Sequence, residues 1–215
     1  NQKSEAEKDS LTWTGEFDRM NSTFFSNTGA VGIKHAYMIN KSNFLQTRVL
    51  ASGNGIGDKA ERLNGEYQTE ERYYENFSQS KITLSSVLNT KLSAKSNLRS
   101  GFFLNHLQYN LFEKGYDESQ GQLVTNIDAQ GATQSIQAFS QLNLRATERL
   151  SFNVGVHYLQ LLLNNSNSFE PRLSASYEID EKQRISLGYG LHSQVQPLGT
   201  YFAKQEENGI TSLPN

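Results

Sequence analysis

The feature that most constrains the fold of this 215-residue chain is a polar and apolar alternation of period two. From Leu150 to Tyr158 every second residue is apolar, and the residues between them are Ser151, Asn153, Gly155 and His157. The same alternation runs over 172–179 and 185–192. Successive side chains of a strand point to opposite faces of a sheet, whereas a helix cannot segregate residues with this period. These segments are therefore predicted to be strands with one apolar and one polar face.

Composition indicates which environment suits such strands. Hydrophobic residues make up 36% of the chain and the mean hydropathy is -0.62, which is low for a packed soluble core. A transmembrane barrel has this composition because only alternate residues touch lipid, and no apolar run approaches the roughly 18 residues of a spanning helix. The net charge of -2 lacks the basic excess that nucleic-acid binding requires. The absence of cysteine excludes disulfides, zinc ribbons and thiol catalysis.

The pattern predicts an all-β fold, an antiparallel up-and-down meander of about nine strands that is part of a transmembrane β-barrel. The expected strands are 10–19, 28–40, 43–55, 80–90, 97–112, 133–147, 150–163, 170–180 and 185–196. The fifth strand loses phase around residues 105–107, which predicts a bulge or a strand that continues beyond the membrane. Residues 1–215 are expected to form a single barrel segment, with 1–9 as a flexible lead-in.

The connections between these strands alternate in length. Short, charged connections are expected at 40–43, 89–97, 147–149 and 180–184, and longer ones elsewhere. Alternate connections of a meander emerge at opposite ends, and outer-membrane barrels have tight periplasmic turns and long extracellular loops. Residues 57–79 and 113–132 are therefore predicted to be long extracellular loops, and 197–215 the start of a further one. A soluble up-and-down barrel also clusters loops at its mouth, so that alternative stays open.

The residue patterns do not predict an enzyme, a metal site or a cofactor. The four histidines lie on different expected strands without metal-ligand spacing; they are His35, His106, His157 and His192. A hydrolase would need His157 and His192 to approach Ser176 across the sheet, and the sequence does not fix that geometry. The glycine-rich segment 53–57 lacks the following helix that a phosphate loop requires, so it indicates the start of a loop.

The predicted loop over 57–79 holds the candidates for ligand binding. Its aromatic residues are interleaved with carboxylates, and such groups can stack on a sugar ring or hold a cationic ligand. The candidates are Tyr67, Tyr73, Tyr74, Glu70 and Glu71. The alternative interpretation is a solvated, charged loop or the extension of two strands above the membrane.

Two segments near the end of the chain carry a family resemblance. The sequences EPRLSASY at 170–177 and SLGYGLHSQVQP at 186–197 resemble the barrel of TonB-dependent outer-membrane receptors. The turn and strand segments at 39–44 and 146–152 are similar to the periplasmic hairpins of that family. The resemblance implies a 22-stranded barrel, plugged by an N-terminal domain, in the outer membrane of Gram-negative cells. It also implies import of a scarce nutrient with energy relayed from the inner membrane.

The chain departs from that family pattern, which makes a fragment of the barrel wall the simplest expectation. About nine strands cannot close such a barrel, no plug or TonB-contacting segment is visible, and Asn215 stands where such barrels usually end in an aromatic residue. The expected function is thus part of the wall and extracellular loops of a nutrient receptor. Its expected partners are outer-membrane lipid, TonB through the plug of the parent protein, and an unidentified small nutrient or glycan, but no nucleic acid.

Two alternatives from other classes remain at this point. One is a complete small outer-membrane barrel that acts as an adhesin or a narrow pore. The other is a soluble β-barrel that binds a hydrophobic ligand inside. In the soluble barrel the apolar face would point inward, and that face includes Val154, Val156, Tyr177 and Leu187.

Overall fold

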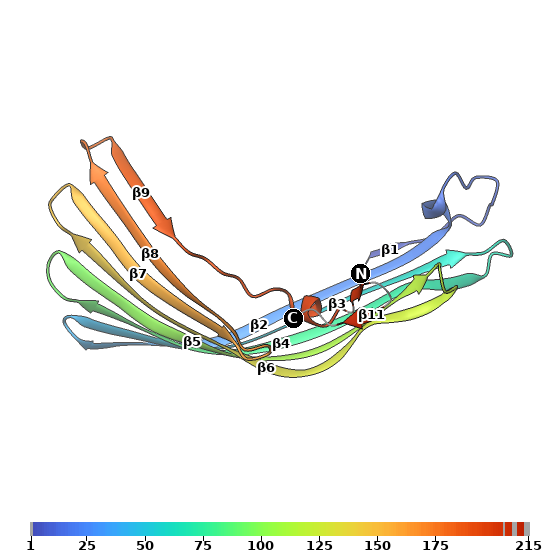
Figure 1. Cartoon of the computed structure of the whole chain (residues 1–215), viewed down its shortest axis with the longest axis horizontal. Coiled ribbons are helices and arrows are strands. Elements are labelled where there is room, and N and C mark those ends of the chain that lie inside the picture. The colour runs from blue at the N-terminus through green and yellow to red at the C-terminus, as the bar shows by residue number, and fades with distance from the viewer. Residues whose placement is uncertain (1, 204, 208–209, 213–215) are drawn as a thin grey trace.

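The computed structural model describes residues 2–203, 205–207 and 210–212, and its main feature is one nine-stranded antiparallel sheet in chain order (Figure 1). The strands are β1 (Gln2–Ser4), β2 (Met20–Asn40), β3 (Asn43–Leu63), β4 (Thr69–Lys91), β5 (Ser96–Asp117), β6 (Gln122–Arg145), β7 (Leu150–Leu161), β8 (Ser166–Glu178) and β9 (Arg184–Gly190). Two 3-10 helices, η1 (Glu16–Arg19) and η2 (Leu198–Tyr201), and a small ladder of β10 (Gln205–Glu207) with β11 (Ile210–Ser212) complete the described residues. The predicted all-β meander is confirmed, and the sheet is open among these residues.

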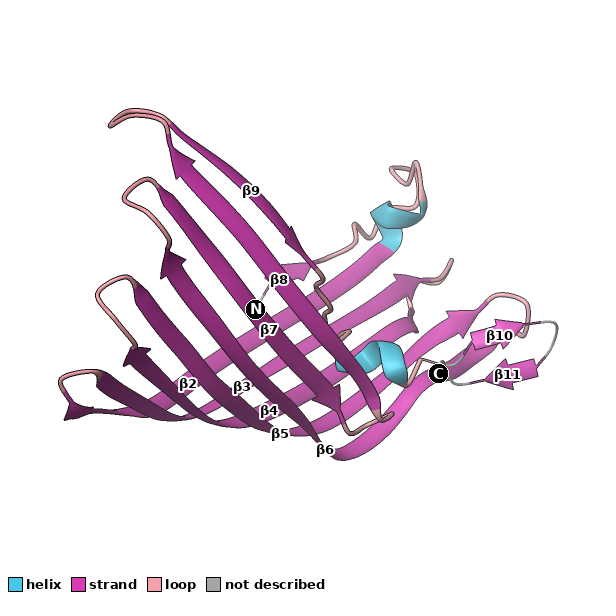
Figure 2. Cartoon of the chain, turned by 60° about the vertical axis from the view of Figure 1, so that its left-hand side comes forward, coloured by secondary structure: helices cyan, strands magenta, loops and turns pink. Residues whose placement is uncertain are grey.

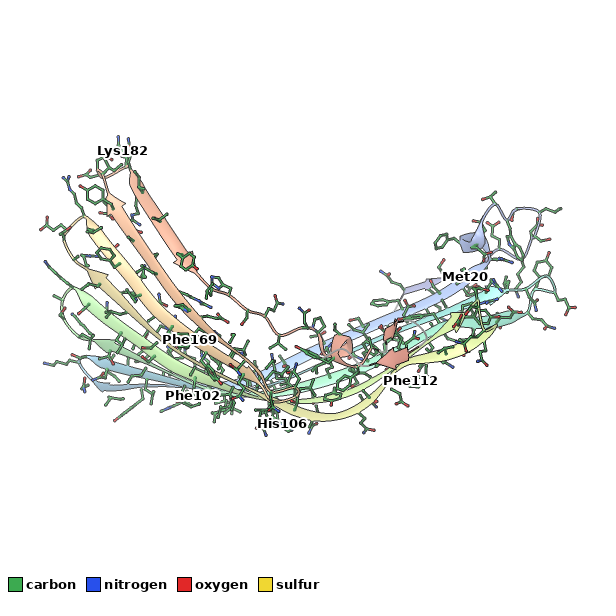
Figure 3. All side chains as sticks on the ribbon, viewed as in Figure 1. Met20, Phe102, His106, Phe112, Phe169 and Lys182 are labelled. Carbon is green, nitrogen blue, oxygen red and sulfur yellow. The ribbon has the colours of Figure 1, made fainter. Side chains whose placement is uncertain are left out.

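Strands β2–β6 are longer than their neighbours and divide the sheet into two halves. They have 21 to 24 residues, whereas β7, β8 and β9 have 7 to 13. The boundary is the cross-strand row Val31, Ala51, Ile82, His106 and Gln134. We call this row and everything on the side of the tight turns the turn half, and the part beyond it the tip half. Figure 3 shows Lys182 at the end of the turn half, Met20 at the end of the tip half and His106 at the bend between them.

The two faces of the sheet differ in curvature and chemistry. Helix η2 lies on the concave face, where Leu198 packs against Leu111 and Ile127 (Figure 2). Since side chains alternate along a strand, the register puts the apolar set of the turn half on the opposite, convex face. Exposed members of this set include Val31, Ile33, Val49, Ile82, Leu84, Phe102, Leu104, Val154, Leu173, Tyr177, Leu187 and Tyr189. The soluble-barrel alternative is therefore wrong, because it needs this set inside.

The apolar band has the height of a membrane span. Along β2 it runs from Val31 to Ile39, nine residues, and tilted transmembrane strands need about 9–11. Ile33 and Leu187 are 77% and 79% exposed, so the described chain leaves them uncovered. No helix of the described residues is long and apolar enough to cross a membrane.

Hydroxyl groups on the convex face of the turn half occur in pairs across neighbouring strands. Thr47 Oγ1 lies 3.2 Å from Ser86 Oγ, and Ser100 Oγ lies 2.8 Å from Ser140 Oγ. Each hydroxyl therefore has a protein partner in a region where the surrounding side chains are apolar. Such pairing removes the cost of leaving a polar group without a hydrogen bond in an apolar medium.

The convex face changes at the start of the tip half. The next outward positions of β3, β4 and β5 beyond Ile82 are Gly53, Gly55, Ser78, Ser80, Gln108 and Asn110, and aromatic side chains return only nearer the tips, at Tyr74 and Phe112. No apolar alternation remains there, and the backbone ladder alone continues the strands. The apolar band thus ends within a single residue pair along each strand.

Several predicted boundaries need correction. The strand expected over 10–19 is wrong: the Asp18 carboxylate accepts hydrogen bonds from the N–H groups of Thr14 and Gly15, which stabilises a turn before η1. Residues 57–79 and 113–132 are mostly strand and not loop, with short connections at 64–68 and 118–121. These segments pair with neighbouring strands because backbone hydrogen bonds between strands do not require an apolar face. Whether these tips face the exterior stays a prediction.

The two ends of the chain also differ from the expected lead-in and loop. Residues 2–4 of the predicted lead-in 1–9 pair with β2 as β1, since edge backbone groups of a sheet accept a further strand. Of the predicted loop 197–215, residues 198–203 fold onto the sheet because Leu198 finds an apolar site there. The remainder of that range is described only as β10 and β11.

Candidate functional site

The concave face of the turn half is polar and forms a shallow groove over β5–β9. This groove has a volume of about 630 Å³, and its lining includes Arg99, Phe103, Phe139, His157, Arg172 and His192. Small residues on β7, β8 and β9 make its floor, among them Gly155, Ser174 and Gly188. The guanidinium of Arg99 lies 5.6 Å from the centre of the Phe139 ring, which is a cation–π contact. The groove therefore combines cationic and aromatic groups on a hydrated face.

Glu170 is the most connected side chain of this face. It is 2% exposed and lies opposite His157, whose Nδ1 is 3.2 Å from Glu170 Oε2. Arg172 donates to the same oxygen at 2.7 Å. The other oxygen accepts from the Ser168 hydroxyl and from the backbone N–H and hydroxyl of Ser193. A buried carboxylate is tolerated only with such partners, so these groups position one another.

Cations predominate on the concave face of the turn half. Those that the register places there are Lys34, Arg48, Lys91, Arg99, Arg145, Arg172 and Arg184. The carboxylates on the same strands and face are Glu170 and Glu178, and each is paired with an arginine. This half of the face therefore has a positive balance.

The concave face of the tip half carries a row of carboxylates instead. Asp58 lies opposite Glu75, and Glu75 lies opposite Glu113. Burial raises the pKa of Glu75, and the charges of Glu113 and Asp58 raise it further, against a hydrogen bond from Tyr73 that lowers it. Burial and the same three carboxylates also raise the pKa of Tyr73. Among the described residues no Lys or Arg forms an ion pair with these three carboxylates.

Tyr67, the first candidate ligand-binding residue, lies at the tip of the β3–β4 hairpin. Its φ of 58° is left-handed, as the tight connection requires. The ring makes an edge contact with Trp13 at a centroid distance of 5.8 Å, and the hydroxyl donates to Ser10. Tyr67 therefore contacts the N-terminal segment and not the other four candidates.

The other candidates are divided between two faces. Tyr73 faces inward and donates to Glu75 at 3.2 Å, whereas Tyr74 faces outward, with Phe112 at 6.0 Å. Lys114 brings Tyr74 and Glu71 together, since its Nζ is 3.0 Å from Glu71 and 5.6 Å from the Tyr74 ring.

Glu70 belongs to a separate network of charges. It pairs with Arg72 at 2.9 Å and with Arg62 at 3.5 Å, and Arg72 stacks 3.8 Å from the Tyr116 ring. The Nε atoms of Arg62 and Arg72 are buried without a hydrogen-bond partner. The five candidates therefore do not form one site, and their role in ligand binding stays a prediction.

The structure does not bring together the histidines and serine of the hydrolase idea. His157 contacts Glu170 and Gln137, while Ser176 is hydrogen-bonded to Ser186, six residues or about 20 Å along β8 from Glu170. His35 and His106 lie on the convex face. Among the described residues no group of His, Asp and Glu side chains has an arrangement that could hold a metal ion.

Sequence reasoning missed Glu170 and the groups that bind it. The only available signal was a lone glutamate at an inward position of β8, level with an inward histidine of β7. That signal depends on the register between two strands and is invisible in either strand alone.

The apolar convex band, the polar concave face and the tight turns define the class of this chain, the wall of an outer-membrane-type β-barrel. The family model described as TonB dependent receptor-like, beta-barrel matches residues 1–214, and the chain belongs to this family of outer-membrane receptors and transporters. The resemblance drawn from 170–177 and 186–197 is thereby confirmed. No curated protein and no solved structure matches the chain significantly.

Proposed function

We propose that this chain forms part of the barrel wall of a nutrient receptor in the Gram-negative outer membrane, with the turn half in the bilayer and the tip half outside the cell. The observation that supports this most strongly is the convex band, which is one membrane span high and ends abruptly at Ile82. Lipid solvates the band, and water solvates the glycine, serine and asparagine side of the tip half.

The length of β2–β6 supports the orientation. A strand of 21 residues or more is about twice a tilted transmembrane strand, so half of it must stand outside the hydrocarbon. In outer-membrane barrels the long projections are extracellular and the tight turns periplasmic. The tips thus present Tyr67, Tyr74 and Glu71 to ligands from outside.

The import itself belongs to the complete barrel. The polar concave face is the wall of the transport path, and the cations of the turn half and the carboxylates of the tip half are the charges that a solute meets along it. Energy for import reaches the barrel from TonB through a plug domain of the parent protein, in keeping with the family. The cargo is a small nutrient or glycan.

The orientation is tested with single cysteines, since the chain has none. Tyr67→Cys lies at a hairpin tip and Lys41→Cys at the tight turn between β2 and β3. A bulky membrane-impermeant maleimide applied to intact cells should label Tyr67→Cys and spare Lys41→Cys until the outer membrane is opened. Reverse or equal labelling of the two positions would refute the orientation.

A further inference from the structure

The segment that follows β9 crosses the concave face instead of leaving the sheet. Residues 191–203 run from the end of β9 to η2 and on to Ala203, and we call them the strap. In Figure 1 the strap passes over the concave side from β9 towards the tip half. Its two contact regions lie on different strands of the sheet, the first on β8 and the second on β4–β6.

The first contact holds the beginning of the strap. Ser193 donates its N–H and its hydroxyl to Glu170, the 2% exposed carboxylate that also binds Arg172. Two residues earlier, the N–H of Leu191 donates to the Pro171 carbonyl at 3.1 Å. This end is therefore fixed to β8 by hydrogen bonds to a charged group, which are stronger than those between neutral groups.

The second contact is apolar and holds the end of the strap. Leu198 is 4% exposed and packs on Leu111 and Ile127, which are 0% and 4% exposed. Phe202 lies 5.0 Å from the ring of Tyr109. Gly199 is so close to the sheet that a Cβ there would stand 3.2 Å from the Phe77 ring.

The position of the second contact separates the two charged regions. Ile127 lies opposite Glu113, the last carboxylate of the tip-half row, and Leu111 lies in the next row towards the turn half. The cationic groove begins further along β5, at Phe103. The strap therefore places an apolar barrier between the carboxylates and the cations of one face.

The apolar contact depends on a few residues of the strap. Leu198 is the buried residue of η2, and Tyr201, Phe202 and Ala203 pack partly buried against the same cluster. Burial of Leu198 alone favours the docked state by roughly tenfold to a hundredfold. Segments with few buried contacts open locally without unfolding the sheet.

We propose that the strap docks reversibly on the concave face and covers the boundary between its two charged regions, with the Ser193–Glu170 contact as its fixed end and the Leu198 contact as its releasable end. The inference rests on the proposed barrel only in that this face then lines the transport path. The docking of the strap, however, can be tested apart from any membrane location.

The docking is tested by cross-linking the full chain in detergent micelles. In the double variant Leu198→Cys and Ile127→Cys, a short bifunctional thiol reagent should join the two positions. The control pairs Leu198→Cys with Leu144→Cys, which lies on the convex face of β6, and should not react. Equal cross-linking of both pairs, or none in the first, would overturn the strap.

The release of the strap from the sheet is tested with Leu198→Asp, a substitution in η2 that changes no residue of the strands. Ala129→Cys faces the concave side under the strap, and Ala132→Cys faces outward on the same strand. Adding Leu198→Asp should raise the maleimide labelling rate of Ala129→Cys by roughly tenfold or more and leave that of Ala132→Cys unchanged. An unchanged rate at Ala129→Cys would refute Leu198 as the releasable end of the strap. If the Leu198–Ile127 pair cross-links but the labelling of Tyr67→Cys and Lys41→Cys contradicts the proposed orientation, the docked strap stands and only the membrane location is refuted.

Discussion

The turn half and the tip half of β2–β6 share strands and a ladder but differ on both faces. In the turn half the convex face is apolar and the concave face cationic, whereas in the tip half the convex face next to the boundary is small and polar and the concave face carries carboxylates. The backbone geometry therefore does not decide which solvent surrounds a strand. The side chains at alternate positions do, and they change together at the row of Ile82.

The comparison is tested most severely by placing a charge on the convex face of each half. Phe102→Arg, in the middle row of the band, should lower the free energy of unfolding in bilayers by about 2–4 kcal/mol, the cost of an arginine near the middle of the hydrocarbon. Asn110→Arg, outward on the same strand in the tip half, should change it little. The lumen-facing control Asn153→Arg should also be mild. Similar losses at Phe102 and Asn110 would contradict the division into halves.

A smaller effect is expected from removing a carboxylate in each half. Glu170→Ala leaves Arg172, Ser193 and Ser168 without their shared acceptor, which should cost about 1–3 kcal/mol of unfolding free energy. Glu71→Ala in the tip half removes one partly exposed ion pair with Lys114 and should cost at most about 1 kcal/mol. Denaturant unfolding in micelles measures both, and a larger loss for Glu71→Ala would reverse the order.

The smallest expected effect is a pH dependence confined to the tip half. The pKa of Glu75 is raised in the folded protein, so ionisation of this carboxyl costs stability as the pH rises through that pKa, and the cost vanishes below the unfolded value near pH 4. Glu75→Gln should therefore slow hydrogen exchange of the tip-half strands at pH 7 and have no effect at pH 4.

The matched control for this experiment has the opposite sign. Hydrogen bonds from Ser119 lower the pKa of Asp117, at the β5–β6 connection, so this carboxylate stabilises the fold above its unfolded pKa. Asp117→Asn should accelerate exchange at pH 7 and lose its effect at low pH. A response of the same sign in both variants would argue against carboxylate ionisation as the cause.

Much of the turn half could be predicted from the sequence because its two faces meet different solvents. That difference forces apolar and polar residues to alternate, as from Leu150 to Tyr158, and the alternation is visible without any partner strand. The tip half gives no such signal, since polar residues occur on both of its faces. Residues 57–63 therefore suggested a loop, although they continue β3.

The candidate site was harder to predict because it depends on register. Glu70 and Glu71 suggested a ligand-binding loop, but the ladder brings Arg62 to Glu70 and Lys114 to Glu71 and neutralises their charge. At the other end, Leu11, Trp13 and Phe17 imitate a strand pattern, and the Asp18 carboxylate favours a turn there instead. Local turn chemistry and cross-strand partners were the two sources of error.

The paired hydroxyls of the convex face have a consequence for how the barrel assembles. Thr47 meets Ser86, and Ser100 meets Ser140, only in the observed register. A slip of β3 against β4 by one residue would turn Thr47 to the lumen, and a slip by two would leave its hydroxyl beside Leu84 or Leu88 with no partner in lipid. A misaligned hairpin thus carries unpaired hydroxyls into lipid during insertion. The hydroxyl pairs therefore favour the correct strand register.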